Sequence, residues 1–145
     1  MVDAVWTDEK TAERCESTDD HVHLIITTPG GKRIVPHCRK ISLRLFFYDL
    51  EPDKIRKTKA FEKEPEKGQE LIDGCFTKEQ AAQIIGFLKL VKGGKLVVNC
   101  EVGVSRSPGV VLALRQHFGG NVEEVFEKAY PNMHVARLLT RALHD

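Results

Sequence analysis

The sequence lacks any long hydrophobic run. No apolar stretch approaches the roughly 20 residues that a membrane-spanning helix needs, and the first residues have no signal-peptide pattern. A strong charge of either sign is also absent, because acidic and basic residues nearly balance to a formal net charge of +1. We therefore expect neither a membrane nor a nucleic acid as a partner. The length of 145 residues predicts a single domain, residues 1–145, with its own hydrophobic core.

Cysteines in a paired arrangement are absent as well. The chain has four cysteines, Cys15, Cys38, Cys75 and Cys100. Their spacing matches no disulfide framework, and together with His21, His23 and His37 it matches no zinc pattern. We therefore expect no metal site, no other cofactor, and a reducing, cytoplasmic environment for the protein.

The most informative stretch of the chain predicts a strand, a tight loop and a helix. Residues 95–98 are a short β-prone apolar run that follows a pair of glycines. Ser107 is a suitable N-cap, and Pro108 suits the first helical position, where a missing N–H costs nothing. A largely apolar segment then runs to a second pair of glycines, where we expect the helix to end.

Five residues separate Cys100 from Arg106 in this loop, and that spacing suits phosphate chemistry. A loop curled over a helix N-terminus points its backbone N–H groups inward and cradles a tetrahedral oxyanion. A cysteine at its mouth sits in a positive field, which favours the nucleophilic thiolate. Arg106 can donate two N–H groups to two phosphate oxygens, Gly103 lets the backbone bend, and the Ser107 hydroxyl can stabilise sulfur as a leaving group.

We therefore predict that Cys100, Arg106 and Ser107 are catalytic residues. The predicted substrate-binding residues are Glu101, Val102, Gly103, Val104, Ser105 and Arg106. In the alternative interpretation, Cys100 is a buried core thiol and Arg106 a surface charge. That interpretation does not explain why glycine, serine and proline also fall where a phosphate loop needs them. The motif lacks the Gly-Lys-Ser/Thr ending of a Walker-type loop.

The segment Cys-Glu-Val-Gly-Val-Ser-Arg-Ser-Pro resembles the signature of cysteine-dependent protein phosphatases, which is Cys-x5-Arg followed by Ser or Thr. It is most similar to the small dual-specificity and phage or bacterial tyrosine-phosphatase-like branch, over roughly residues 95–120 and more weakly over 41–145. The resemblance implies hydrolysis of a phosphomonoester through a phosphocysteine, without a metal ion. The family usually has a histidine that holds the loop at the position of Asn99, so this departure predicts reduced activity.

A phosphoryl-transferring cysteine needs a partner that protonates the leaving oxygen and later activates water. The resemblance implies that this general acid is an Asp at the end of a hydrophobic strand, and Asp49 follows the apolar alternation of residues 41–48. The rivals are Glu51, Asp53 and Asp73. Asp73 lies closer to the usual family interval before the cysteine, but the charged residues 51–70 look inserted, which favours Asp49. An Asp that only caps the turn after the strand is a further alternative.

Strands and helices alternate along the chain, which predicts an α/β fold with a mostly parallel central sheet flanked by helices. The Cys-x5-Arg loop would then lie at the carboxyl end of a strand, where such sheets bind their ligands. The expected strands are 21–28, 41–48 and 95–98, and the expected helices are 5–16, 81–91, 108–118, 122–129 and 135–143. Thr77 and Gln80 have the form of a capping box. The charged residues 51–70 are expected to form an exposed loop or helical turn.

The favoured function is hydrolysis of a phosphorylated protein side chain, phosphotyrosine first and then phosphoserine or phosphothreonine, or of a small phosphomonoester. The variable loop positions carry no Lys or Arg to hold extra phosphates, which disfavours phosphoinositides. The near-neutral charge disfavours an RNA 5′-phosphatase. Asn99 keeps open a non-catalytic phosphate-binding module, and sulfur transfer is a more distant alternative. The resemblance also keeps open a protective disulfide between Cys75 and Cys100.

Overall fold

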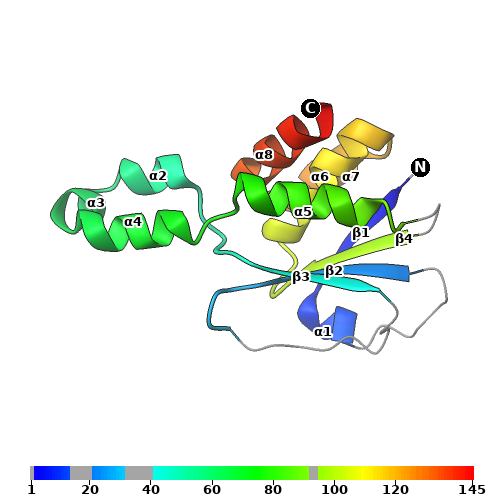
Figure 1. The fold of residues 1–145 in the computed structure, drawn as a ribbon, viewed down its shortest axis with the longest axis horizontal. Coiled ribbons are helices and arrows are strands. Elements are labelled where there is room, and N and C mark those ends of the chain that lie inside the picture. The colour runs from blue at the N-terminus through cyan, green and yellow to red at the C-terminus, as the bar shows by residue number, and fades with distance from the viewer. Residues whose placement is uncertain (1, 14–20, 32–40, 92–94) are drawn as a thin grey trace.

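The computed structural model describes residues 2–13, 21–31, 41–91 and 95–145. Its centre is a four-stranded sheet in the order β1-β4-β2-β3, in which every neighbouring pair of strands is parallel (Figure 1). The strands are β1 Asp3–Asp8, β2 His21–Thr27, β3 Ser42–Phe46 and β4 Lys95–Cys100. The predicted α/β fold with a parallel central sheet is therefore confirmed.

Helices cover both faces of this sheet (Figure 1). One face carries α5 Lys78–Leu88, α6 Arg106–Phe118, α7 Val122–Lys128 and α8 Met133–His144. The other face carries the short helix α1 Glu9–Glu13. Because parallel strands need crossover connections, helices on both faces are the expected arrangement for such a sheet.

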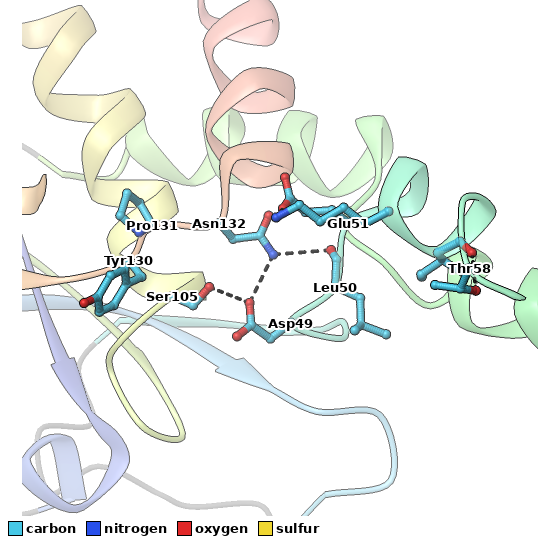
Figure 2. A pocket seen from close by; sticks show the side chains of 10 residues that line it. Asp49, Leu50, Glu51, Thr58, Ser105, Tyr130, Pro131 and Asn132 are labelled. Atoms are coloured by element: carbon cyan, nitrogen blue, oxygen red, sulfur yellow. Dashed lines mark hydrogen bonds and ion pairs between the residues drawn. The ribbon is translucent and has the colours of Figure 1, made fainter. Parts of the chain in front are cut away.

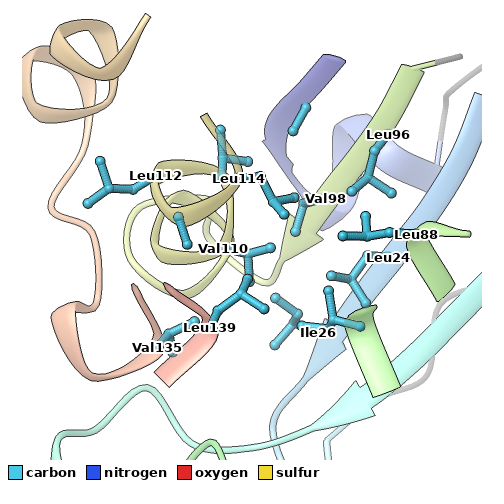
Figure 3. Packing of buried hydrophobic residues seen from close by; sticks show 14 of the residues in the cluster. Leu24, Ile26, Leu88, Leu96, Val98, Val110, Leu112, Leu114, Val135 and Leu139 are labelled. Carbon is cyan, nitrogen blue, oxygen red and sulfur yellow. The ribbon is translucent and has the colours of Figure 1, made fainter. Parts of the chain in front are cut away.

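The main hydrophobic core lies between the sheet and the larger group of helices (Figure 3). Leu24 of β2 and Val98 of β4 are register partners, and both are fully buried in this core. Residues 110–114 of α6 are buried on every side, because the helix lies between the sheet and α8. Burial of each large apolar side chain contributes about 1.5–3 kcal/mol, so the core holds α6 firmly against β4.

The predicted capping box at the start of α5 is confirmed. Thr77 Oγ1 accepts a hydrogen bond from Gln80 N, and Gln80 Oε1 accepts one from Thr77 N, both at 3.1 Å. The Gln80 side chain also donates from Nε2 to the Phe46 carbonyl at 2.9 Å. This contact ties the N-terminus of α5 to the carboxyl end of β3.

The charged segment after β3 forms three short helices instead of the expected exposed loop or helical turn. They are α2 Pro52–Arg56, α3 Lys59–Lys63 and α4 Pro65–Asp73, and together they form an arm that projects beside the sheet (Figure 1). Proline stands in the first turn of α2 and of α4, and Thr58 Oγ1 caps α3 by accepting from Phe61 N at 3.1 Å. The Phe61 ring packs so tightly on Gly68 that a Cβ there would overlap it. Local caps and this contact therefore fold the arm without a large core.

The helix predicted over residues 5–16 is also wrong. Residues 3–8 form β1, which pairs in parallel with β4 so that Trp6 lies opposite Val98. Among the described residues of the predicted helix, only those of α1 are helical, and residues 14–16 lie outside the described residues. Ala4 and Trp6 face the main core while Val5 between them faces the other side, which is the period of a strand. Pairing with the central strand therefore decides the conformation, and Asp8 Oδ1 starts α1 by accepting from Thr11 N at 2.7 Å.

None of the helices in the described part of the chain is long and apolar enough to cross a bilayer. Among the described residues, no group of three or more His, Cys, Asp and Glu side chains is placed to hold a metal ion. Cys15, His37 and Cys38, which entered the zinc analysis of the sequence, lie outside the described residues.

Asn99 carries a buried and unsatisfied amide on β4. Its neighbour Ile25 packs with Ala12 of α1, so the side chain lies on the α1 face of the sheet. Asn99 is only 1% exposed, and within the described part of the chain neither Oδ1 nor Nδ2 has a hydrogen-bond partner. A buried amide without a partner costs about 1–3 kcal/mol.

Replacing Asn99 by Val should therefore stabilise the fold. The substitution removes the unsatisfied amide and introduces a β-branched side chain suited to a strand. We expect the free energy of unfolding to rise by about 1 kcal/mol, measured by urea denaturation, with a gain of a few degrees in Tm. As a control, Asn99→Asp should lower the stability, because it buries a charge. A lower Tm for the Val variant would contradict the prediction.

Candidate active site

The Cys-x5-Arg loop, residues 100–106, joins the carboxyl end of the central strand β4 to the N-terminus of α6. The helix begins at Arg106 with Ser105 at the N-cap position, so the predicted cap at Ser107 is wrong by two residues. The Ser105 carbonyl accepts hydrogen bonds from Gly109 N at 3.0 Å and from Asn132 N at 2.9 Å. The second of these bonds comes from a segment far along the chain. The local sequence therefore did not reveal where α6 begins.

Cys100 lies at the positive end of α6. Its Sγ is 3.1 Å from Ser107 Oγ and accepts a hydrogen bond from Ser107 N at 3.5 Å. The thiol is 2% exposed and Ser107 is fully buried. The Ser107 backbone amide and hydroxyl therefore both contact this sulfur at the first turn of the helix.

Arg106 is a buried charge and not a surface residue, since it is only 6% exposed. Its Nη1 donates to Thr28 Oγ1 at 3.0 Å and to the Phe47 carbonyl at 2.9 Å. Its Nη2 lies 4.0 Å from Glu101 Oε1. Both of these hydrogen bonds use Nη1, while Glu101 faces Nη2. The Nε and Nη2 atoms form the edge of the guanidinium that suits bidentate contact with an anion.

Thr28 is a site residue that the sequence analysis missed. Besides accepting from Arg106, it donates its backbone N–H to Glu101 Oε1 at 3.3 Å. Hydrogen bonding from Thr28, assisted by the charge of Arg106, lowers the pKa of Glu101 from its usual 4.5. Thr28 follows β2, the strand next to β4, so its place at the same carboxyl edge was the available signal.

Gly103 lets the loop pack against the end of β1. Its φ is +75°, and a Cβ at this position would lie only 2.8 Å from Asp8 N. Glu9 N donates to the Glu101 carbonyl at 3.3 Å from the same side. Within the described chain, the backbone amides of residues 102–106 donate to no protein acceptor, and they are therefore free to bind an oxyanion.

Asp49, the predicted general acid, lies beside this loop (Figure 2). Its Oδ1 accepts from Ser105 Oγ at 2.7 Å and from Asn132 Nδ2 at 3.1 Å. Asp73 ends α4 in the arm and accepts from Gln69 Nε2 at 2.8 Å. The structure therefore brings Asp49, and not Asp73, into contact with the Cys-x5-Arg loop.

The other two rivals of Asp49 are engaged in ion pairs. Glu51 pairs with Lys54 at 2.6 Å, and Asp53 pairs with Arg56 at 3.0 Å. Both acids lie at the start of the arm, in or just before α2.

Asn132 supports both the loop and Asp49. It is buried, and its Oδ1 caps α8 by accepting from Val135 N at 3.2 Å. Its Nδ2 donates to the Leu50 carbonyl at 3.3 Å as well as to Asp49. Two residues earlier, Tyr130 N donates to the Val104 carbonyl at 2.9 Å. Residues 130–132 thus pack behind the loop and link it to the segment after β3.

Two residues that the sequence analysis linked to this loop, Asn99 and Cys75, do not bond to it through their side chains. The unsatisfied side chain of Asn99 makes no hydrogen bond to it, in contrast to the loop-holding histidine that the resemblance implies. Cys75 and Cys100 are both free, and the Cys75 Sγ donates to the Leu71 carbonyl at 3.3 Å. Burial raises the pKa of the Cys75 thiol, although the charge of Arg56 opposes this, so Cys75 is a poor nucleophile.

A hollow of about 490 Å³ adjoins the loop on the side of the arm (Figure 2). It is lined by Asp49, Leu50, Glu51, Lys54, Ile55, Thr58, Ser105, Tyr130, Pro131 and Asn132. Figure 2 shows Tyr130 and Thr58 on opposite sides of it, with Asp49 and Leu50 between them.

No model of a known protein family matches the chain, and no curated protein matches it. Among solved structures, it is similar to a crystal structure of a human tyrosine phosphatase-like serine/threonine/tyrosine-interacting protein. The identity is 22% and the TM-score 0.42, and the match covers 85% of this chain and 76% of the human one. At this identity and TM-score, the likeness assigns neither an activity nor a partner to the chain.

Glu101 should make the stability of the protein depend on pH. A carboxyl whose pKa is lowered by folding stabilises the folded state above its usual pKa, and this contribution is lost as the pH falls through the lowered value. Urea denaturation should therefore show stability falling below about pH 4.5, with a shallower fall for Glu101→Gln. The effect should be small, because the side chain is 39% exposed.

Glu127→Gln is the matched control, because it removes an exposed carboxylate from α7 and leaves the loop intact. If both variants change the slope equally, the Thr28 and Arg106 contacts do not set the pH dependence.

Proposed function

We propose that this chain is a metal-independent phosphomonoester hydrolase that acts through a phosphocysteine on phosphorylated protein side chains, phosphotyrosine first. The observation that carries the proposal is the position of Cys100 Sγ, which meets Ser107 at the N-terminus of α6 within the loop that ends at Arg106. The nucleophile, the anion-binding groups and an acid candidate then come from the protein itself. A reducing, cytoplasmic setting would keep the thiol available.

In the first step, the Cys100 thiolate attacks phosphorus, so an S–P bond forms and the P–O bond to the leaving group breaks. Asp49 gives its proton to the leaving oxygen. The amides of residues 102–106 and the Nε–Nη2 edge of Arg106 bind the equatorial oxygens of the phosphoryl group, whose charge they stabilise. The hydrogen bonds that already hold Arg106 mean that little reorganisation is needed.

In the second step, water attacks the phosphocysteine and Asp49 takes the proton from that water. The S–P bond breaks, and inorganic phosphate leaves. The Ser107 hydroxyl, 3.1 Å from the sulfur, stabilises the departing thiolate by donating a hydrogen bond to it. Asp49 and Cys100 thereby return to their starting protonation states.

The second candidate function is a non-catalytic phosphate-binding module. The observation that favours it is Asn99, whose buried amide does not hold the loop. In that case the loop would bind a phosphorylated side chain but turn it over slowly or not at all.

Hydrolysis of a small aryl phosphate in the presence of EDTA tests the proposal directly. We expect turnover in EDTA and a loss of roughly 10³-fold or more for Cys100→Ser, because the hydroxyl is a far weaker nucleophile. Vanadate binding by the Ser variant should persist, since the amides and Arg106 remain. The matched control is Cys75→Ala, which removes the other described buried thiol and should keep turnover.

Near-normal turnover by Cys100→Ser would show that this cysteine is not the nucleophile. Vanadate binding by a wild-type protein that hydrolyses nothing would favour the binding module instead.

The role of Asp49 can be tested through the leaving group. If Asp49 is the general acid, Asp49→Asn should lower kcat on phosphotyrosine by about 10²–10⁴-fold. An aryl phosphate with a good leaving group needs less protonation and should lose less. The variant should also flatten the basic limb of the pH–rate profile.

Asp73→Asn is the matched control, because Asp73 contacts Gln69 in the arm. If that variant shows the leaving-group-dependent loss and Asp49→Asn does not, the general acid lies in the arm.

A further inference from the structure

We propose that the hollow beside the Cys-x5-Arg loop receives an apolar side chain of the polypeptide that carries the phosphorylated residue, and that the helical arm is its recognition wall. This inference rests on the proposed function and adds a specificity element to it. The hollow lies between residues of α2, the segment before it, and residues 130–132 (Figure 2).

The hollow is continuous with the candidate active site. Asp49 and Ser105 line it, and both belong to the catalytic arrangement, joined by a hydrogen bond of 2.7 Å. A peptide whose phosphorylated side chain enters the loop can therefore place a neighbouring side chain in the hollow. Its volume of about 490 Å³ falls in the range of small-ligand pockets, roughly 300–1,000 Å³, and has room for a large side chain.

The charged groups of the hollow already have partners. Glu51 pairs with Lys54 at 2.6 Å and with Arg137 at 3.5 Å. Asp49 accepts hydrogen bonds from Ser105 and Asn132. A charged guest would have to compete with these contacts and lose its own hydration, so it would gain little.

The apolar groups of the hollow, in contrast, are half-buried or exposed. Leu50, Ile55, Tyr130 and Pro131 provide its apolar surface. Tyr130 is 83% exposed, and the other three are half-buried. Exposed apolar groups gathered at one place mark interaction sites, and tyrosine often contributes strongly to binding. The chemistry of the lining therefore fits an aliphatic or aromatic side chain.

The arm is built to present this wall. Its helices pack on one another through Phe61 and Gly68, and none of their side chains is buried in the main core. Thr58 lies on the side of the hollow opposite Tyr130 (Figure 2), and Ile55 of α2 lines the hollow as well. The charged segment 52–73 adds little to the main core, and lining the hollow gives it a role in binding.

The test compares phosphotyrosine peptides that differ only in one flanking residue, Leu or Ser, at each position near the phosphotyrosine. We expect a preference for Leu of about tenfold in kcat/KM at one position, because burying a leucine side chain stabilises the bound state. Tyr130→Ala should lower the ratio of kcat/KM for the Leu peptide to that for a small aryl phosphate by about tenfold. Ile55→Thr, which makes another lining residue polar, should lower the same ratio.

Phe126→Ala is the matched control. Phe126 lies on α7 and is, like Tyr130, an exposed aromatic residue (53% exposed), but it does not line the hollow. It should leave the ratio unchanged. Equal turnover of Leu and Ser peptides at every position would overturn the inference, and so would an equal effect of Tyr130→Ala and Phe126→Ala.

The small aryl phosphate separates the two proposals, because it reaches the loop but not the hollow. If wild-type protein fails to hydrolyse it, the proposed hydrolase is wrong. The inference is then decided by peptide affinity, measured by fluorescence anisotropy on the full chain with Cys100→Ser. A preference for Leu in Kd that Tyr130→Ala removes supports the hollow, and its absence overturns it.

Discussion

The buried guanidinium of Arg106 is the interaction on which the site depends. A charge that is only 6% exposed is tolerated only when hydrogen bonds and an opposite charge compensate for its lost hydration. Those partners, Thr28, the Phe47 carbonyl and Glu101, follow three different strands and meet at one edge of the sheet. Arg106 therefore requires the parallel sheet, and it holds the segment that carries Asp49 two residues after Phe47.

The rest of the loop is held from two further sides. Gly103 fits against the end of β1, where any side chain would strain the backbone. Asn132 binds the Ser105 carbonyl and the Asp49 carboxylate while it caps α8. Because α6 and α8 pack against each other in the same core, these contacts hold the Cys-x5-Arg loop in place within the fold.

The arm has a different physical character. Its helices owe their stability to proline starts, a threonine cap and the contact of Phe61 with Gly68, and not to the core. The sequence and length of such an element can change without lowering the stability of the sheet, as is general for surface connections. It nevertheless lies beside the Cys-x5-Arg loop, because it joins the segment after β3 to α5.

Local features of this protein were determined by the sequence alone. The strand and helix around the Cys-x5-Arg loop and the capping box at Thr77 depend on residues a few positions apart, so their physics is visible in the order of side chains. Tertiary structure decided the rest. Residues 3–8 became a strand because β4 offered a partner, and Thr28 and Asn132 joined the site because parallel strands and a distant helix end bring them there. These contacts link residues far apart in the chain, and local sequence patterns do not predict which distant groups will come into contact.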